Sequence, residues 1–214
     1  MNARENIIQR IRKALGPGTP PPLPAAAGIP FRPVNAWDLR PRFESKFGEL
    51  KGEFHRAANA AAGREALKRI VAANSFQSIA AANHPDVAAV TEGLPGLRVP
   101  KGPDAAGAAL AGTDLGITAC DSLVAYTGSI VLTSRTGHGR ALSILPPAHL
   151  VVARISQIVP HLADALARIE KHHGADKPSM ISIISGPSRT SDIEKTLVLG
   201  AHGPKRLLVL LLDE

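Results

Sequence analysis

The N-terminal part of the chain carries one helical pattern followed by a proline-rich stretch. In residues 2–15 isoleucine and leucine recur at three- and four-residue steps, which predicts a short amphipathic helix. Residues 16–33 contain seven prolines and little directional pattern, so we expect an extended, semi-rigid linker. The chain is therefore expected to divide into an extension, residues 1–33, and a main domain, residues 34–214.

A second apolar stripe begins after the linker. Phe43, Phe47 and Phe54 recur at helical spacing opposite a charged face, which predicts a helix over residues 36–61. A further helix is expected over residues 64–74. The stripe is interpreted mainly as a packing face for the main domain, with a docking surface for a partner chain as the alternative.

From residue 76 onward, short apolar runs alternate with turns and helical stretches. This alternation predicts an α/β fold of three layers, with a mostly parallel sheet and helices on both faces. Residues 78–82 and 87–90 are each expected to form a short strand or a buried turn. The expected strands are 114–119, 122–125, 129–134, 149–155, 180–184 and 207–212, and the expected helices are 104–110 and 160–173.

Composition narrows the class of protein. The 214 residues include a single cysteine, Cys120, which excludes an internal disulfide, a four-cysteine zinc site and an iron–sulfur cluster held by the chain's own cysteines. The longest apolar run, Leu207–Leu212, is far too short to span a membrane. The basic first fifteen residues lack the apolar stretch of a signal peptide. We therefore expect a cytoplasmic protein with no membrane span.

The formal net charge of +7 raises the question of nucleic-acid binding. Residues 1–60 carry ten Lys and Arg against five Asp and Glu, so most of the excess lies near the N-terminus. Only two of the seven aromatic residues, Phe76 and Tyr126, lie beyond residue 60. Because a single-strand binder needs aromatic platforms among its basic residues, nucleic acid is not expected as a partner.

The segment 180–194 carries the most informative candidate site. A buried strand is expected to end at Ser185, and Gly186-Pro187 then turns the chain toward a helix capped by Thr190 or Ser191. Unpaired N–H groups and the positive end of a helix dipole attract anions at the carboxyl end of such a strand. The Gly186–Asp192 turn is therefore a candidate site for a carboxylate or phosphate. The alternative is a capped helix start with no ligand.

Two further segments supply polar groups. His202 lies between two glycines and is interpreted as a general base, an anion contact or a plain loop residue. Thr127-Gly128-Ser129, with Arg140 beyond it, is either a ligand approach or an ordinary hairpin turn. The candidate ligand-binding residues are Thr127, Gly128, Ser129, Arg140, Gly186, Ser188, Arg189, Thr190, Asp192 and His202.

Familiar catalytic motifs are absent from the sequence. It contains no P-loop, no GxGxxG that opens a helix, no GxSxG elbow and no HExxH. The eight histidines are scattered, so no metal site is expected, and Cys120 is expected to be buried and inert.

Five motifs together resemble the LutC/YkgG group of the lactate-utilisation (LUD) domain family, over roughly residues 40–212. They are GITA at 116–119, AYTGSIVL at 125–132, GRALSILP at 139–146, GPSRTSDIE at 186–194 and LVLGAHGP at 197–204. The resemblance implies a fold like that of the sugar-phosphate isomerase and CoA-transferase superfamily. It also implies a role beside two iron–sulfur proteins in the oxidation of L-lactate to pyruvate.

The sequence departs from the pattern of the family at Tyr126, where many relatives carry an acidic residue. A carboxylate base at that turn is therefore not expected here. No glutamate occupies the place that would carry a CoA-transferase intermediate, so that activity is not expected either. The resemblance supplies no catalytic residues.

Three functions follow as hypotheses. The first is an accessory subunit of an L-lactate oxidising system that binds a small anion and holds no cofactor, the iron–sulfur clusters lying on partner proteins. The second is a free-standing enzyme on a phosphorylated or CoA-linked substrate, argued from the fold alone. The third is a nucleic-acid binder, which rests only on charge.

Overall fold

The computed structural model describes residues 3–15, 39–100, 110, 112–137, 140–191, 197–199 and 203–214. Within these ranges, only the backbone is described for residues 15, 189–191 and 197–199. The chain divides into two units, residues 1–33 and 34–214. The first contains the expected amphipathic helix, α1 (Ala3–Leu15), with Ile7 and Ile11 exposed.

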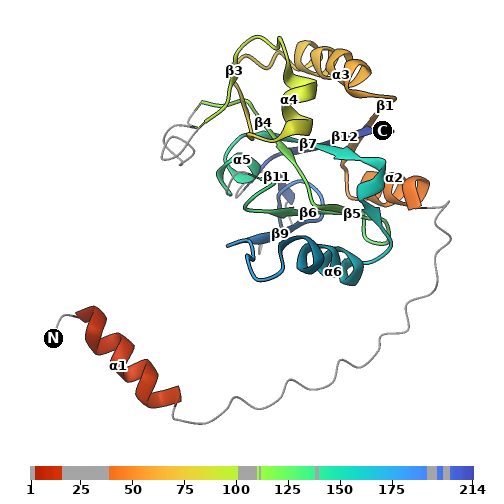
Figure 1. Ribbon diagram of the computed structural model, residues 1–214. Helices are drawn as coiled ribbons and strands as arrows, with labels where there is room; N and C mark the ends of the chain where they lie inside the picture. The colour runs from red at the N-terminus through yellow and green to blue at the C-terminus, as the bar shows by residue number, and fades with distance from the viewer. Residues whose placement is uncertain are drawn as a thin grey trace. The chain divides into compact units, whose positions relative to one another are not determined.

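The main unit is built on a sheet of six parallel strands, in the order β1-β12-β7-β4-β2-β3 (Figure 1). Because all six strands are parallel, their carboxyl ends share one edge of the sheet and their amino ends share the other. Strand β12, which lies between β1 and β7, is apolar along almost its whole length because both of its faces are covered. The strands are β1 (Glu53–Ala57), β2 (Ile79–Ala81), β3 (Leu97–Arg98), β4 (Leu115–Ala119), β7 (Ala148–Arg154) and β12 (Arg206–Leu212).

Two helices, α3 (Ala60–Ala73) and α4 (Pro85–Thr91), cover one face of this sheet (Figure 1). Asn59 caps α3 by accepting a hydrogen bond from the N–H of Ala62 over 2.9 Å. The alternate residues Leu208, Leu210 and Leu212 of β12 are fully buried toward these helices.

The opposite face packs against helix α2 (Leu39–Glu49) and a second, four-stranded sheet (Figure 1). Phe43 and Phe47 of α2 are fully buried there, with ring centroids 5.3 Å apart. Helix α6 (Leu162–His173) covers the far side of the second sheet. That sheet has the order β8-β5-β6-β9 and contains β5 (Ser122–Val124), β6 (Ser129–Thr133), β8 (Ile158–Val159) and β9 (Ile181–Ile184). The remaining elements are α5 (Ala141–Ile144), a 3-10 turn (Ile155–Gln157), β10 (Arg189–Ser191) and β11 (Leu197–Leu199).

The predicted fold class is confirmed: the domain is α/β, with a mostly parallel sheet and helices on both faces. The second sheet was not foreseen. In the part of the chain that the structure describes, no helix has the length and apolar character that a membrane crossing requires.

The helix predicted over residues 36–61 is wrong in its second half. The chain leaves α2 at Glu49, turns through Lys51 at a φ of 68°, and continues as strand β1. Gly52 allows this turn, because a Cβ there would lie 2.4 Å from the ring of Phe47. Phe54 therefore reaches the same apolar cluster from a strand.

Three further expectations are corrected. Residues 87–90 belong to helix α4, which Pro85 begins after the cap residue His84. Strand β9 is a partly exposed edge strand antiparallel to β6, with Ile181 and Ile183 exposed, rather than a buried parallel strand. No helix begins at Thr190 or Ser191, because Arg189–Ser191 form strand β10, which pairs antiparallel with β11. The helix predicted over residues 104–110 lies outside the described residues, apart from Leu110.

Candidate functional site

The predicted ligand turn lies at the amino-terminal edge of the main sheet. The N–H of Ser188 donates to the carbonyl of Pro204 over 2.8 Å, and the N–H of Lys205 donates to that of Pro147 over 2.8 Å. Strands β12 and β7 begin directly after Lys205 and Pro147. The turn therefore has neither the carboxyl-edge position nor the helix dipole that the sequence suggested.

A cavity of about 340 Å³ opens beside this turn. We call it the serine cleft, because hydroxyls from two separate segments of the chain line it. Hydroxyl groups donate hydrogen bonds to carboxylate and phosphate oxygens. Its lining residues are Ser143, Ile144, Ser182, Ile183, Ile184, Ser185, Gly186, Ser188, Gly203 and Pro204.

The structure brings several of the predicted site residues to this cleft. Gly186 and Ser188 line it. Ser129 is joined to it, because its Oγ lies 2.8 Å from the Oγ of Ser185. The hydroxyl of Ser129 also donates a hydrogen bond to the Oγ1 of Thr127 over 2.7 Å. The turn at 127–129 and the segment at 185–188 are therefore neighbours.

The structure does not show the side chains of the other predicted residues lining the serine cleft. Arg140 is exposed and precedes α5, which supplies two lining residues, but its own side chain does not line the cleft. Arg189 and Thr190 lie in β10, where only the backbone is described. Asp192 and His202 fall outside the described residues.

Two glycines near the cleft are required by the packing of α2 and the turn that follows it. Gly128 has a φ of +66°, and a Cβ there would lie 2.6 Å from the backbone of Lys46 and Phe47. Gly186 has a φ of +93°, and a Cβ there would lie 2.9 Å from the carbonyl oxygen of Leu50. At Gly128 the group that approaches closely is therefore the backbone of α2, not a ligand.

Tyr126 is held between two side chains. The guanidinium carbon of Arg42 lies 3.8 Å from the centroid of its ring, within the range of a cation–π contact. The ring of His161 lies 4.3 Å away on a tilted plane. Tyr126 therefore fastens α2 to the start of α6.

A second cavity, of about 370 Å³, lies at the carboxyl edge of the main sheet and was missed by the sequence analysis. We call it the carboxyl-edge cavity. Sequence could have pointed to it, because Asp121 follows β4, Arg154 ends β7, and α6 ends in two histidines. Its lining residues are His84, Asp86, Cys120, Asp121, Arg135, Thr136, Arg154, Ser156, Gln157, Arg168, His172 and His173.

Cys120 lies at this cavity but is buried, as expected. Burial, followed by the negative charge of Asp121, raises the pKa of its thiol far above the ordinary value. The thiol therefore stays protonated and is a poor nucleophile.

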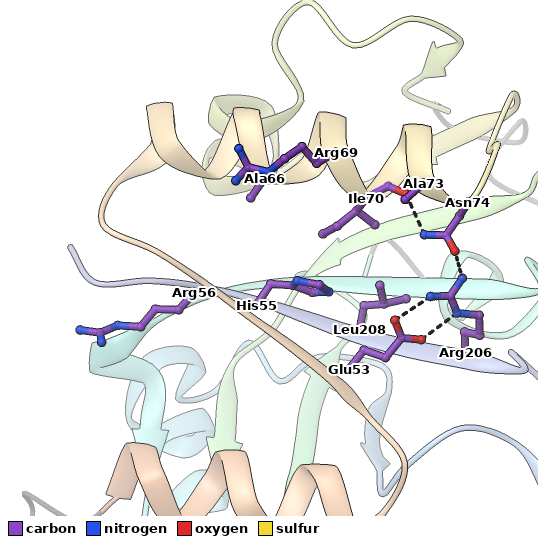
Figure 2. Close-up of a pocket in the computed structure, with 10 residues that line it drawn as sticks. All are labelled: Glu53, His55, Arg56, Ala66, Arg69, Ile70, Ala73, Asn74, Arg206 and Leu208. Atoms are coloured by element: carbon purple, nitrogen blue, oxygen red, sulfur yellow. Dashed lines mark hydrogen bonds and ion pairs between the residues drawn. The ribbon is translucent and has the colours of Figure 1, made fainter.

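A third cavity, of about 480 Å³, lies between the edge strand β1 and α3 (Figure 2). Glu53 accepts two hydrogen bonds from Arg206, of 2.7 and 2.6 Å, and Arg206 also donates to Asn74. The Nε2 of His55 is buried without a hydrogen-bond partner among the described residues, and burial chiefly lowers its pKa. Figure 2 shows Arg56 directed away from the other side chains; it pairs with Asp213 over 2.7 Å. This network ties β1 to β12 and to the end of α3.

Among the residues that the structure describes, no group of three or more His, Cys, Asp or Glu side chains is placed to hold a metal ion.

Comparison with known proteins gives three findings. Residues 41–212 match the family model described as the LUD domain. "Lactate utilization protein C" of Halalkalibacterium halodurans is 37% identical over 103 residues, which cover 47% of this chain and 45% of that protein. The protein of the same name from Bacillus pumilus is 41% identical over 96 residues, covering 44% of this chain and 40% of that protein. The matched part of the chain thus spans less than half the length of these curated relatives.

The solved structure of a DUF162 family protein from Deinococcus radiodurans superimposes with a TM-score of 0.65. The match covers 84% of this chain and 99% of that one, at 24% sequence identity. At that identity the likeness supports the fold alone.

Proposed function

The chain belongs to the LUD domain family, and from that premise we propose that it takes part in lactate utilisation as an accessory, non-redox subunit. It acts in the cytoplasm beside iron–sulfur proteins that oxidise L-lactate to pyruvate. The observation that carries the proposal is the family match over residues 41–212, together with relatives named for lactate utilisation. The single cysteine supports a division of labour in which the clusters lie on the partner proteins.

The proposal includes a small anionic ligand at the Gly186–Asp192 turn. Support comes from the hydroxyls of the serine cleft, from Gly203 opposite Ser188, and from the bond between Ser129 and Ser185. Arg189, Thr190, Asp192 and His202 complete the proposed ligand set, and Arg140 directly precedes α5, which supplies Ser143 and Ile144 to the lining. No helix dipole contributes, so the hydroxyls and Arg189 supply the attraction.

The ligand is tested by thermal unfolding of the full chain with L-lactate, pyruvate, inorganic phosphate, a sugar phosphate and a CoA ester. A ligand that binds only the folded state raises the melting temperature in a saturable way. We expect a carboxylate or phosphate to do so in the unmodified protein. In Ser188→Ala the shift should shrink, while Ser179→Ala, an exposed serine outside the cleft, should keep it.

The same screen separates this function from its alternative. Stabilisation by the sugar phosphate or CoA ester, with none by lactate or pyruvate, would favour a free-standing enzyme on such a substrate. No saturable shift with any of the five compounds would contradict the ligand site.

The partners are tested by co-purification. The full chain should elute with the iron–sulfur proteins of a lactate-utilisation system in size-exclusion chromatography. Separate elution at concentrations well above micromolar would contradict a stable complex.

A further inference from the structure

The carboxyl-edge cavity carries a set of charged groups that the proposed function does not use. In a parallel α/β sheet, ligands bind outside the carboxyl ends of the strands. Here the strands β4 and β7 end at the cavity, and α6 delivers the side chains of its last two turns to it. The position is therefore one that the fold itself favours for a ligand.

The two carboxylates at this cavity are already engaged by protein groups. Asp86 accepts hydrogen bonds of 2.9 and 2.6 Å from the guanidinium of Arg154. The side chain of Asp121 is only 6% exposed; its Oδ2 accepts from Thr136 over 2.7 Å, and its Oδ1 lies 3.7 Å from the Nε2 of His173. Neither acid neutralises the remaining cations.

Neither of these two carboxylates pairs with Arg168, which also lines the cavity. Its Nη1 donates to the backbone carbonyl of Ser156 over 2.8 Å, and no carboxylate among the described residues pairs with it. Its Nε is buried and has no hydrogen-bond partner among the described residues. That atom has no access to solvent, so a ligand would meet the Nη groups instead, whose remaining N–H donors make no hydrogen bond among the described residues.

Further hydrogen-bond donors line the cavity with Arg168. His172 and His173 line the cavity from the end of α6. Arg135 lines it too, and its ion pair is with Asp176, whose side chain is 82% exposed. An exposed pair of that kind is weak and can open to a better acceptor. The guanidinium fork of Arg matches the two oxygens of a carboxylate or phosphate group.

We propose that the carboxyl-edge cavity is a second binding site, for a small oxyanion held by Arg168 with His172 and Arg135 beside it. The shared chemistry is that of a carboxylate or a phosphate group. Asp121, which is buried, and His173, which is partly exposed, line the same space. The site lies at the opposite edge of the main sheet from the serine cleft and does not depend on the lactate role.

The test uses isothermal titration of the full chain with sodium phosphate and, separately, with sodium L-lactate, against sodium chloride at matched ionic strength. We expect saturable binding of at least one of the two anions. Binding of phosphate alone identifies a phosphate site, and binding of lactate alone identifies a carboxylate site. No saturable binding of either anion would overturn the proposal.

Variants assign the binding to this cavity. Arg168→Gln should weaken the affinity at least tenfold, whereas Arg69→Gln, which removes an exposed charge elsewhere, should change it less than twofold. Ser188→Ala should leave it unchanged, which separates this site from the serine cleft. Unaltered affinity in Arg168→Gln would overturn the proposal.

A second variant guards against a folding defect. Arg168→Gln loses the bond to Ser156, whereas His172 is exposed, so His172→Gln should fold normally. We expect His172→Gln to weaken the affinity about threefold. Affinity equal to that of the unmodified protein in this variant would count against the assignment as well.

Discussion

His149 is a fully buried histidine at the centre of the main sheet. Its Nε2 lies 2.9 Å from the Oγ1 of Thr118, which is also fully buried, and its Nδ1 has no partner among the described residues. Burial lowers its pKa from 6.5 to about 3. The ring is therefore neutral at any ordinary pH.

This pKa predicts a pH dependence of stability. Between the folded pKa and the unfolded value the unfolded chain binds more protons, so the free energy of unfolding falls as the pH drops below about 6.5. From pH 6.5 to pH 5 the loss from this group is on the order of 2 kcal/mol. In His149→Gln, which keeps a donor for Thr118, the free energy of unfolding in urea should fall by about 2 kcal/mol less between pH 6.5 and pH 5 than in the unmodified protein. An unchanged slope would contradict the buried neutral state.

Gly128 supplies a second prediction at this scale, because it has a positive φ and also lies against the backbone of α2. Gly128→Ala should lower the free energy of unfolding by about 3 kcal/mol, from strain and clash together. Gly93→Ala is the matched control: its φ is +71° and nothing lies within 4 Å of its Cβ position. That control should lose only about 1 kcal/mol in the same urea titration. Equal losses of unfolding free energy in the two variants would show that the close approach of the α2 backbone adds no cost at Gly128.

At the scale of elements, the edge strand β1 pairs with a single neighbour, β12, among the strands that the structure describes. The ion pair between Glu53 and Arg206 joins these two strands where both begin. Both side chains are 37% exposed, so solvent screens the pair. Its two-point geometry still makes it stronger than a simple surface pair.

A double-mutant cycle tests this attachment. Glu53→Gln and Arg206→Gln should show a coupling energy of about 1 kcal/mol in urea unfolding. The control is the exposed pair of Glu65 and Lys68 on α3, whose coupling should be about 0.3 kcal/mol. A coupling no larger than that of the control would mean that backbone pairing alone holds β1.

The sequence pattern predicted the buried strands of the main sheet well but did not predict the place of strand β9. The apolar runs at 149–155 and 207–212 predict buried strands, and the structure confirms both, because such runs are typical of the interior of a parallel sheet. The run at 180–184 looks the same in sequence, yet β9 lies at the edge of a second sheet. Periodicity reports burial on average and does not tell which sheet a strand joins.

The candidate site, like the strands, was predicted only in part from the sequence. Gly186 and Ser188 are predicted from their turn chemistry, and the structure places both at the serine cleft; that they bind a ligand stays a prediction. The helix expected after them is a strand, since a capping pattern alone does not exclude a hairpin. The carboxyl-edge cavity was missed because Asp121, Arg154 and Arg168 are far apart in sequence, and only the strand order brings them together.

At the scale of the whole molecule, the extension and the main domain differ in composition. Residues 1–33 carry five Lys and Arg against one Glu, and none of the described residues among them is buried. The buried core of the described chain lies entirely in residues 43–212.

Deletion of residues 1–33 should therefore leave the melting temperature of the remaining domain within about 2 °C of that of the full chain. The same deletion should abolish any salt-dependent retention on DNA, because it removes most of the excess charge. A melting temperature lowered by about 10 °C would show that the extension supports the core. Tight DNA retention by the truncated protein would revive the nucleic-acid hypothesis.

The most direct test of the proposed function is L-lactate-dependent reduction of an artificial electron acceptor. The purified full chain is assayed alone, the iron–sulfur partner proteins alone, and then all of them together. We predict no turnover by the chain alone and the highest turnover in the complete mixture. Lactate oxidation by this chain on its own would contradict the account, and so would partners whose rate does not change when the chain is added.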